Sequence, residues 1–324
     1  MRVWAGVAFL ALALLAADVQ AEPKQVVVQL PAAPVSIWTD GKSLGVRLKN
    51  GRIAGFTAKG KSAKPPKQLQ EKVPAGGLPD GVLVRGSSDI RKAWLTGPTR
   101  RYGHAVLGDG IEAGGLAVKT AKGKFLEYVL PKSEVFEDRF ARIADLDGDG
   151  ASEIIAVNSH ADFGAALSVF GVRNGKLSLF SRTPFIGTSN RWLNPAGIAD
   201  FDGDGRKEVA IVVTPHIGGT LQFWELRGGK LKLQAEKYGF SNHFIGSRIQ
   251  DISEFAGGSN PVLVLPGADR KTLLGVSLRG KTVRVDWQIA LGGKVMTEIV
   301  SFRSQEKSPA IAAGLSDNSL LILN

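Results

Sequence analysis

The chain has 324 residues and no cysteine, which excludes disulfides, thiol chemistry and zinc–thiolate sites. Its net charge of +11 is uneven, because residues 41–132 hold 18 Lys and Arg against 6 Asp and Glu while the remainder is about neutral. A local positive field of this kind attracts polyanions, such as acidic polysaccharide or another acidic glycan polymer, lipopolysaccharide, anionic lipid or nucleic acid. Lysines that only solvate a surface give the same pattern.

Residues 1–21 have the pattern of a secretory signal peptide. Arg2 precedes an apolar run over residues 4–17, and Val19-Gln20-Ala21 has the form of a cleavage site. The run is short for a membrane span, so we expect no transmembrane segment after cleavage. The expected location is the periplasm or the extracellular space, which argues against nucleic acid as a partner.

Residues 22–78 contain short apolar stretches and a basic, proline-containing segment. Residues 25–30 predict a strand, and Asn50-Gly51 predicts a hairpin turn. Lysines and Pro65-Pro66 in residues 58–81 predict a loop or linker. Beyond it, Ser88-Asp89 is able to cap a short helix through Ala93. We therefore separate N-terminal strands and a basic loop over 22–78 from a main domain over 79–324.

Two nearly identical acidic loops occupy residues 145–153 and 200–208. Each has carboxylates at positions one, three, five and nine, two glycines between them, and an apolar strand-like run afterwards. Oxygen ligands on a flexible, Gly-rich loop suit Ca²⁺ better than Zn²⁺ or Mg²⁺. An EF-hand is excluded because its twelfth position needs Glu, where this chain has Ala156 and Ile211. The predicted ligands of two structural Ca²⁺ ions, with carbonyl oxygens at Ala151 and Arg206, are Asp145, Asp147, Asp149, Ala151, Glu153, Asp200, Asp202, Asp204, Arg206 and Glu208.

The acidic loops belong to an internal repeat of about fifty residues. Their first residues are 55 positions apart, and the clearest copies are residues 141–195 and 196–250. Each copy continues with a second strand and a tight turn, at Asn174-Gly175 and Gly228-Gly229. A third copy, from Asp251, has Ser253 and Phe255 in place of carboxylates. The pattern predicts an all-β fold, a β-propeller of about six or seven four-stranded blades, in which residues 25–30 complete the last sheet.

The order of acidic loop, strand, Gly-containing gap and strand resembles the FG-GAP/VCBS repeat. This repeat forms the N-terminal propeller of integrin α subunits and occurs in many exported bacterial proteins. Residues 145–170 and 200–224 match the motif well, although Glu153 and Glu208 replace the more frequent Asp. The resemblance implies a Ca²⁺-binding propeller and leaves the biological function open, because the fold serves many functions.

A second set of repeated residues combines polar or cationic groups with aromatic rings. Arg191-Trp192 and His243-Phe244 each precede a blade, and His216 occupies the position that His160 has in the preceding copy. Such pairs suit a sugar or an anion, and they also suit an ordinary contact between blades. The candidate ligand-binding residues are Arg191, Trp192, His216, Asn242 and His243.

No motif of a known enzyme class is visible in the sequence. The densest carboxylates are used by the acidic loops, which leaves no acid/base pair for glycoside hydrolysis. The sequence therefore favours an exported, monomeric, calcium-binding propeller that acts as a protein-interaction or recognition scaffold in the cell envelope. A carbohydrate- or polyanion-binding module is the alternative, and a polysaccharide-active enzyme, such as a lyase with a Tyr, Lys or Arg base, is the third possibility.

Overall fold

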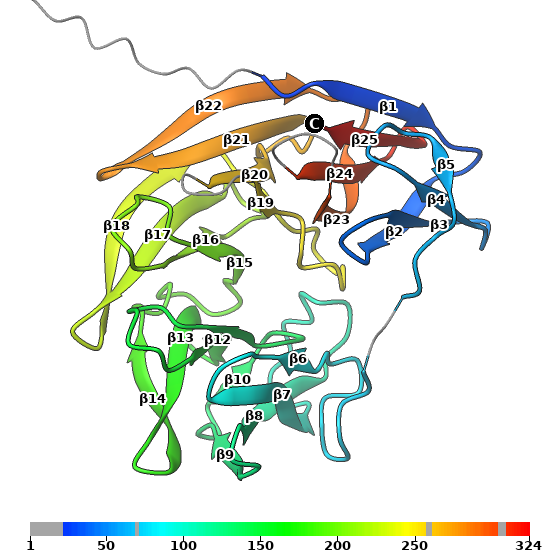
Figure 1. The fold of residues 1–324 in the computed structure, drawn as a ribbon. Coiled ribbons are helices and arrows are strands. Elements are labelled where there is room, and N and C mark those ends of the chain that lie inside the picture. Colours follow the sequence, from blue (N-terminus) through cyan, green and yellow to red (C-terminus); the bar gives the residue numbers. More distant parts are fainter. Residues whose placement is uncertain (1–21, 69–70, 257–260, 304–308) are drawn as a thin grey trace, which may run out of the picture.

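The computed structural model describes residues 22–68, 71–256, 261–303 and 309–324, which form antiparallel sheets arranged as a ring (Figure 1). The predicted signal peptide lies outside these residues. Within them, no helix is long and apolar enough to cross a membrane.

Four of the sheets have four strands each, and every sheet is an antiparallel meander. Their strands are β15 (Leu193–Ala199), β16 (Glu208–Val213), β17 (Thr220–Arg227) and β18 (Lys230–Tyr238); β19 (Glu254–Ala256), β20 (Val262–Pro266), β21 (Thr272–Arg279) and β22 (Thr282–Ala290); β23 (Val295–Phe302), β24 (Ala310–Leu315), β25 (Ser319–Leu323) and β1 (Gln25–Gln29); and β2 (Pro34–Thr39), β3 (Leu44–Leu48), β4 (Ile53–Phe56) and β5 (Ser62–Ala63).

The remaining nine strands form one sheet that consists of two further meanders. The first contains β6 (Val84–Arg85), β7 (Ile90–Thr99), β8 (Glu112–Thr120) and β9 (Phe125–Val129), and the second contains β11 (Arg142–Ala144), β12 (Glu153–His160), β13 (Gly164–Arg173) and β14 (Lys176–Arg182). Strand β10 (Glu134–Phe136) joins them, because it pairs with β12 and, through Phe136 and Ala113, with β8. The described residues therefore form a β-propeller of six four-stranded blades.

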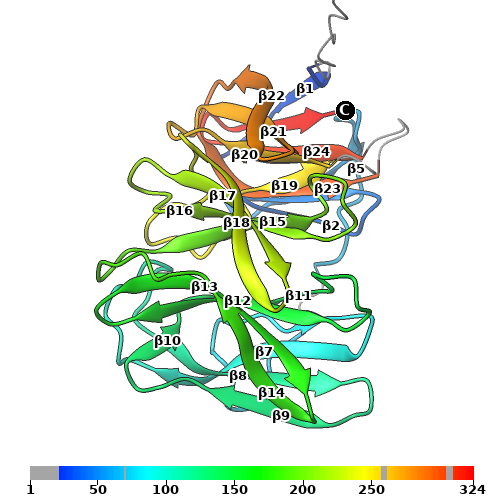
Figure 2. The ribbon, with the colours of Figure 1, turned by 90° about the vertical axis from the view of Figure 1, so that its left-hand side faces the viewer.

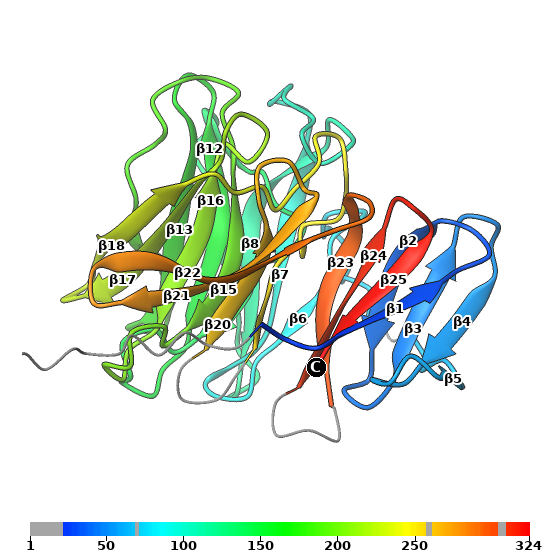
Figure 3. The ribbon, with the colours of Figure 1, turned by 90° about the horizontal axis from the view of Figure 1, so that it is seen from above.

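The N-terminal strand closes the ring. Strand β1 pairs antiparallel with β25, from Gln25 opposite Leu323 to Gln29 opposite Ser319 (Figure 3). This pairing confirms the expectation that residues 25–30 complete the last sheet, and it removes an exposed sheet edge. Because β2–β5 form a blade of their own, residues 22–63 belong to the ring and are not separate from residues 79–324.

The short helix expected after Ser88-Asp89 is wrong, because residues 90–99 form strand β7. The Asp89 carboxylate accepts a hydrogen bond from the backbone of Ser152 (2.8 Å), so it binds a neighbouring blade and does not cap a helix. The predicted hairpin turns are confirmed. Asn174 and Gly175 have φ angles of 52° and 71°, and Gly228 and Gly229 have φ angles of 57° and 73°, which are the positive values that such turns require.

The hydrophobic core is divided among the interfaces between blades. In one cluster, Phe223 and Phe240 from the β15–β18 blade pack with Leu263 and Val276 from the β19–β22 blade. Complete burial of one such side chain contributes about 1.5–3 kcal/mol. The outer strands β14 and β18, which face the viewer in Figure 2, are mostly exposed or half-buried. The packing therefore fixes the angle between blades and holds their connecting loops in place.

Five inner strands, β2, β11, β15, β19 and β23, surround a central cavity of about 510 Å³. Asp251, Ser253 and Phe255, which begin the third repeat, line this cavity together with Glu298. Burial raises the pKa of Asp251 and of Glu298. Among the described residues, the groups of converging carboxylates include no residue of the third repeat.

Candidate metal centres

The first acidic loop connects β11 to β12 and is folded around Asp145. One carboxylate oxygen of Asp145 accepts a hydrogen bond from the backbone of Gly148 (2.8 Å), and the other accepts one from Gly150 (3.0 Å). Both glycines have positive φ angles, 78° and 87°, which most residues avoid. The two glycines of the motif therefore allow the chain to turn tightly around a carboxylate.

The second acidic loop connects β15 to β16 and repeats this arrangement. Asp200 accepts hydrogen bonds from the backbone of Gly203 (2.7 Å) and Gly205 (2.9 Å). These two glycines also have positive φ angles, 82° and 90°. The same local sequence thus produces the same backbone at both positions.

Three of the four predicted carboxylates converge in each loop. Oxygen atoms of Asp145, Asp147 and Glu153 lie within 4.8 Å of one another, and so do those of Asp200, Asp202 and Glu208. Glu153 and Glu208 are the first residues of β12 and β16, and their side chains are buried. Each fixes the start of its loop by accepting a backbone hydrogen bond, from Leu146 (2.9 Å) and Phe201 (2.8 Å) respectively.

The electrostatics of the two groups favour a cation. Burial, reinforced by Asp147, Asp149 and Asp145, raises the pKa of Glu153 to about 7. Burial and the nearby Asp202 likewise raise the pKa of Glu208 to about 7. A bound cation would relieve the repulsion that makes ionisation of these carboxylates unfavourable.

A buried oxygen without a partner shows that the second group fits a metal ion. Oε2 of Glu208 binds the backbone of Phe201, whereas Oε1 is buried and has no hydrogen-bond partner in the described structure. Such an orphaned acceptor is costly unless something binds it. The candidate metal-ligand atoms in both loops are all oxygen atoms, and oxygen ligands suit Ca²⁺. Asp149 and Asp204 lie outside the converging groups of carboxylates. The carbonyls of Ala151 and Arg206 remain predicted ligands.

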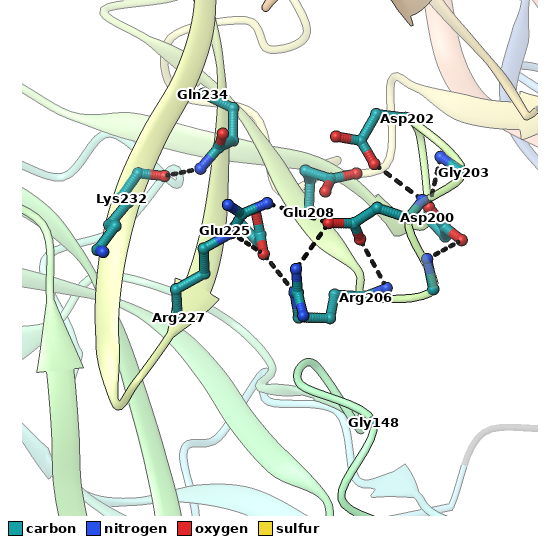
Figure 4. A network of polar contacts seen from close by, with 12 residues as sticks. Gly148, Asp200, Asp202, Gly203, Arg206, Glu208, Glu225, Arg227, Lys232 and Gln234 are labelled. Carbon is teal, nitrogen blue, oxygen red and sulfur yellow. Dashed lines mark hydrogen bonds and ion pairs between the residues drawn. The ribbon is translucent and has the colours of Figure 1, made fainter. Parts of the chain in front are cut away.

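The second loop also carries an ion-pair network (Figure 4). Among the described residues, no salt bridge involves a carboxylate of the first loop. Asp204 accepts a hydrogen bond from the backbone of Arg206 (2.9 Å) and pairs with the side chains of Arg206 (2.8 Å) and Arg227 (3.0 Å). The backbone hydrogen bond, followed by the charges of the two arginines, lowers the pKa of Asp204. The same arginines contact Oε1 of Glu225, at 2.6 Å and 2.5 Å. Asp204 is therefore already partnered in the absence of a metal.

Sequence reasoning missed Glu225. This residue lies on β17 directly opposite Glu208 on β16, and its Oε2 atom is buried without a partner in the described structure. The corresponding position in the first copy is Gly171, which lies opposite Glu153 by continuation of the β12–β13 register. Because this difference lies outside the nine-residue motif, it is visible only once the strand pairing is known.

The two acidic loops touch each other. Lys207 donates hydrogen bonds to the first loop from its backbone, to the carbonyl of Leu146 (2.9 Å), and from its side chain, to the carbonyl of Asp145 (3.1 Å). Figure 4 shows Gly148 of the first loop beside the second. A change in the backbone of one loop is therefore transmitted directly to the other.

The candidate ligand-binding residues lie at the other end of the strands, and three of them are interior. Trp192, Asn242 and His243 are buried. The indole of Trp192 donates to the carbonyl of Glu137 (2.9 Å), and the amide of Asn242 donates to the carbonyl of Pro195 (3.2 Å). These side chains hold blades together, and the Trp192 ring offers no open face on which a sugar could stack.

The ring of His216 contacts the buried rings of Trp192 and His243. It lies parallel to Trp192 with centroids 6.1 Å apart, and its Nε2 is 2.9 Å from Nδ1 of His243. Burial lowers the pKa of His216 to about 4 and that of His243 to about 3. Arg191 is half-buried, and its guanidinium contacts the carbonyl of Asn190 (3.3 Å). The five residues therefore combine a structural core with one residue, His216, that reaches a cavity.

Comparison with known proteins identifies the repeat. A family model described as an FG-GAP-like repeat matches residues 145–211, which contain both acidic loops. The search of curated proteins gave no match. Among solved structures, a crystal structure of BBS1N in complex with ARL6DN, soaked with mercury, is similar over 93% of this chain and 95% of that chain, with a TM-score of 0.47 and 12% sequence identity. From the strand pairing and the family match together, the chain is a β-propeller that carries FG-GAP-like repeats.

Proposed function

We propose that the chain is an exported β-propeller that binds two Ca²⁺ ions and acts as a protein-interaction scaffold in the cell envelope. A propeller of this type is in general a suitable interaction module, because its rigid ring presents many loops at two ends. The observation that carries the calcium assignment is the convergence of three carboxylates in each acidic loop, with Oε1 of Glu208 buried and unpartnered.

The residues that would hold the ions are the two converging groups. Asp145, Asp147 and Glu153 would hold one ion, and Asp200, Asp202 and Glu208 the other. Calcium would place a positive charge between the converging carboxylates of each acidic loop and would stabilise the entry to β12 and β16. The chain itself supplies the rigid backbone around Asp145 and Asp200, whose hydrogen bonds to glycine amides orient the carboxylates.

Calorimetric titration of the chelator-treated protein with Ca²⁺ tests the metal assignment. We expect two sites, of which Asp147→Asn and Asp202→Asn each remove one. Asp162→Asn is the matched control, because Asp162 is an exposed aspartate in the turn after β12, at the opposite end of that strand. An unchanged stoichiometry in both loop variants would sink the assignment.

The scaffold role and the envelope location need a separate test. Cell fractionation with crosslinking should recover the mature chain in the envelope, attached to a protein partner. A glycan and anionic-polymer array, run in Ca²⁺ and in chelator, addresses the alternative function. Specific glycan binding that requires Ca²⁺ would replace the scaffold proposal with a carbohydrate-binding one, whereas a silent array supports the scaffold.

One observation favours the polyanion-binding alternative. Lys59, Lys61, Lys64 and Lys67 lie on or beside β5 and are all exposed. No salt bridge joins these lysines to a carboxylate in the described part of the chain. Binding to an acidic polysaccharide that disappears in about 1 M salt, and on substitution of these lysines by Gln, would support this function.

A further inference from the structure

A cavity of about 270 Å³ lies near the opposite end of β16 from the acidic loop. It is formed by the turn after β16, the segment after β18 and the turn between β20 and β21. Its lining residues are Pro215, His216, Ser241, Phe244, Ile245, Ala268 and Arg270. We call it the Arg270 pocket.

Arg270 has no counter-ion among the described residues. Its guanidinium lies over the ring of Phe244, 4.0 Å from the centroid, and one nitrogen donates a long hydrogen bond of 3.3 Å to the carbonyl of His243. Within the described part of the chain, the Nε atom is buried without a hydrogen-bond partner. Desolvation lowers the pKa of Arg270. A desolvated charge without a partner destabilises a folded protein.

The backbone of Arg270 is also strained. Its φ angle of 57° lies in the left-handed region, which Gly and Asn adopt readily and other residues adopt at a cost of about 1 kcal/mol. The chain thus places an arginine where glycine would be more stable. Both costs make Arg270 a candidate for a functional residue.

The other polar groups of the pocket add no charge at neutral pH. Nε2 of His243 lies 2.9 Å from the carbonyl of Ser247, which can only accept, so His243 carries its proton on Nε2. Its Nδ1 therefore accepts a hydrogen bond from Nε2 of His216, and both rings are neutral. Ser241 contributes a hydroxyl, and no hydrogen bond of this hydroxyl to another described residue is present. The pocket thus offers one positive charge, with neutral polar groups from His216 and Ser241 and apolar surface from Pro215, Phe244 and Ile245.

We propose that the Arg270 pocket binds the carboxylate of a monoanionic organic ligand. The planar guanidinium matches a carboxylate through two parallel hydrogen bonds. A single cation balances a single negative charge, whereas a phosphate dianion would leave one charge unpaired. Phe244, Ile245 and Pro215 provide apolar contact for the body of the ligand. This site is separate from the acidic loops and does not depend on the calcium proposal.

Two pairs of probes test the chemistry on the purified full chain by ligand-observed NMR. Benzoate and hexanoate should bind and saturate the protein, whereas benzamide and hexanamide should not. Inorganic phosphate should bind at least about tenfold more weakly than benzoate. Equal binding of the acids and their amides, or phosphate binding as tight as benzoate binding, would overturn the proposal.

Variants of Arg270 assign the binding to this pocket. Arg270→Gly removes the guanidinium at a φ angle that glycine adopts freely, so the protein should remain folded, and benzoate binding should be lost. Arg270→Lys keeps the positive charge but removes the planar guanidinium that forms two parallel hydrogen bonds, so it should weaken binding by about tenfold. Arg173→Gln is the matched control, because Arg173 also lies over a ring, that of Phe180, at 3.8 Å. Retention of benzoate binding in Arg270→Gly, or its loss in Arg173→Gln, would contradict the assignment.

A further pair of probes distinguishes the source of the carboxylate. A peptide that ends in Phe with a free carboxyl terminus is compared with the same peptide ending in an amide. If the acid form binds more tightly than benzoate and the amide form does not bind, the ligand is the carboxyl end of a peptide chain. If only the small acids bind, the ligand is a free organic acid. Failure of all carboxylates to bind would overturn the proposal.

Discussion

Glu208 and Glu225 face each other across β16 and β17, and each keeps one carboxylate oxygen buried without a hydrogen-bond partner among the residues that the structure describes. Two carboxylates so placed repel each other, and Glu225 is held by Arg206 and Arg227. Glu225 therefore adds a negative charge beside Glu208 in the second copy. In the first copy the residue opposite Glu153 is Gly171, which carries no charge.

This pairing predicts that the two calcium sites differ. Glu225→Gln should weaken Ca²⁺ binding at the second loop by about tenfold, because it removes a nearby negative charge from a buried position. Binding at the first loop should not change. Calorimetric titration of a chain whose first loop is disabled by Asp147→Asn isolates the effect. Unchanged affinity would mean that Glu225 serves only to bind Arg206 and Arg227.

The fifth loop position should matter more in the first loop than in the second. Asp204 is held by Arg206 and Arg227, whereas Asp149 has no arginine partner among the described residues. Asp149→Asn is therefore expected to reduce calcium affinity at its loop by about tenfold, and Asp204→Asn by about threefold. The measurement is the Ca²⁺ dissociation constant of each variant. A larger effect at Asp204 would show that calcium displaces the arginines.

Trp192 and Arg191 provide a test of the buried aromatic cluster. Trp192→Ala should lower the free energy of unfolding by about 3–5 kcal/mol, because the indole is buried between blades and donates to Glu137. Arg191→Ala should change it by less than about 0.5 kcal/mol. Urea unfolding measures both. A stable Trp192→Ala protein that no longer binds a glycan would instead make Trp192 a ligand-binding residue.

Glu112 should give the protein an unusual dependence of stability on pH. Burial, with the neighbouring charge of Glu137, raises the pKa of Glu112 to about 9, whereas the unfolded chain releases this proton near pH 4.5. Between these values the folded state holds one more proton than the unfolded state, so Glu112 destabilises the fold increasingly as the pH rises.

Substitution of Glu112 by Gln should therefore stabilise the protein at pH 8 by roughly 4–5 kcal/mol and have little effect at pH 4. Urea midpoints at the two pH values measure this difference. Glu236→Gln, at an exposed position of β18, is the control. A Glu112→Gln protein that is less stable at pH 8 would indicate that the carboxylate has a partner that stabilises its charge.

The sequence predicted features that depend on neighbouring residues. Both acidic loops and the Asn174-Gly175 and Gly228-Gly229 turns were found because their backbone is set within nine residues or fewer. Ser88-Asp89 was misread because the partner of the Asp89 carboxylate, the backbone of Ser152, lies in another blade. The sequence does not predict the Arg270 pocket, because the residues around Arg270 come from separate segments that only the fold brings together. The burial of Trp192 likewise depends on Glu137 and His243, which are distant in sequence.

The pairing of β1 with β25 also constrains the order in which the molecule assembles. Gln29 and Ser319 are direct partners although they lie 290 positions apart in the chain. During synthesis the emerging chain can pair strands within a blade as soon as each meander is complete. The blade of β23, β24, β25 and β1 is complete only after β25 has been made. Until residues 319–323 are made, β1 has no partner and the ring stays open, so an unfinished chain cannot become trapped as a closed propeller. The ring can therefore close only after the whole segment between β1 and β25 has been synthesised.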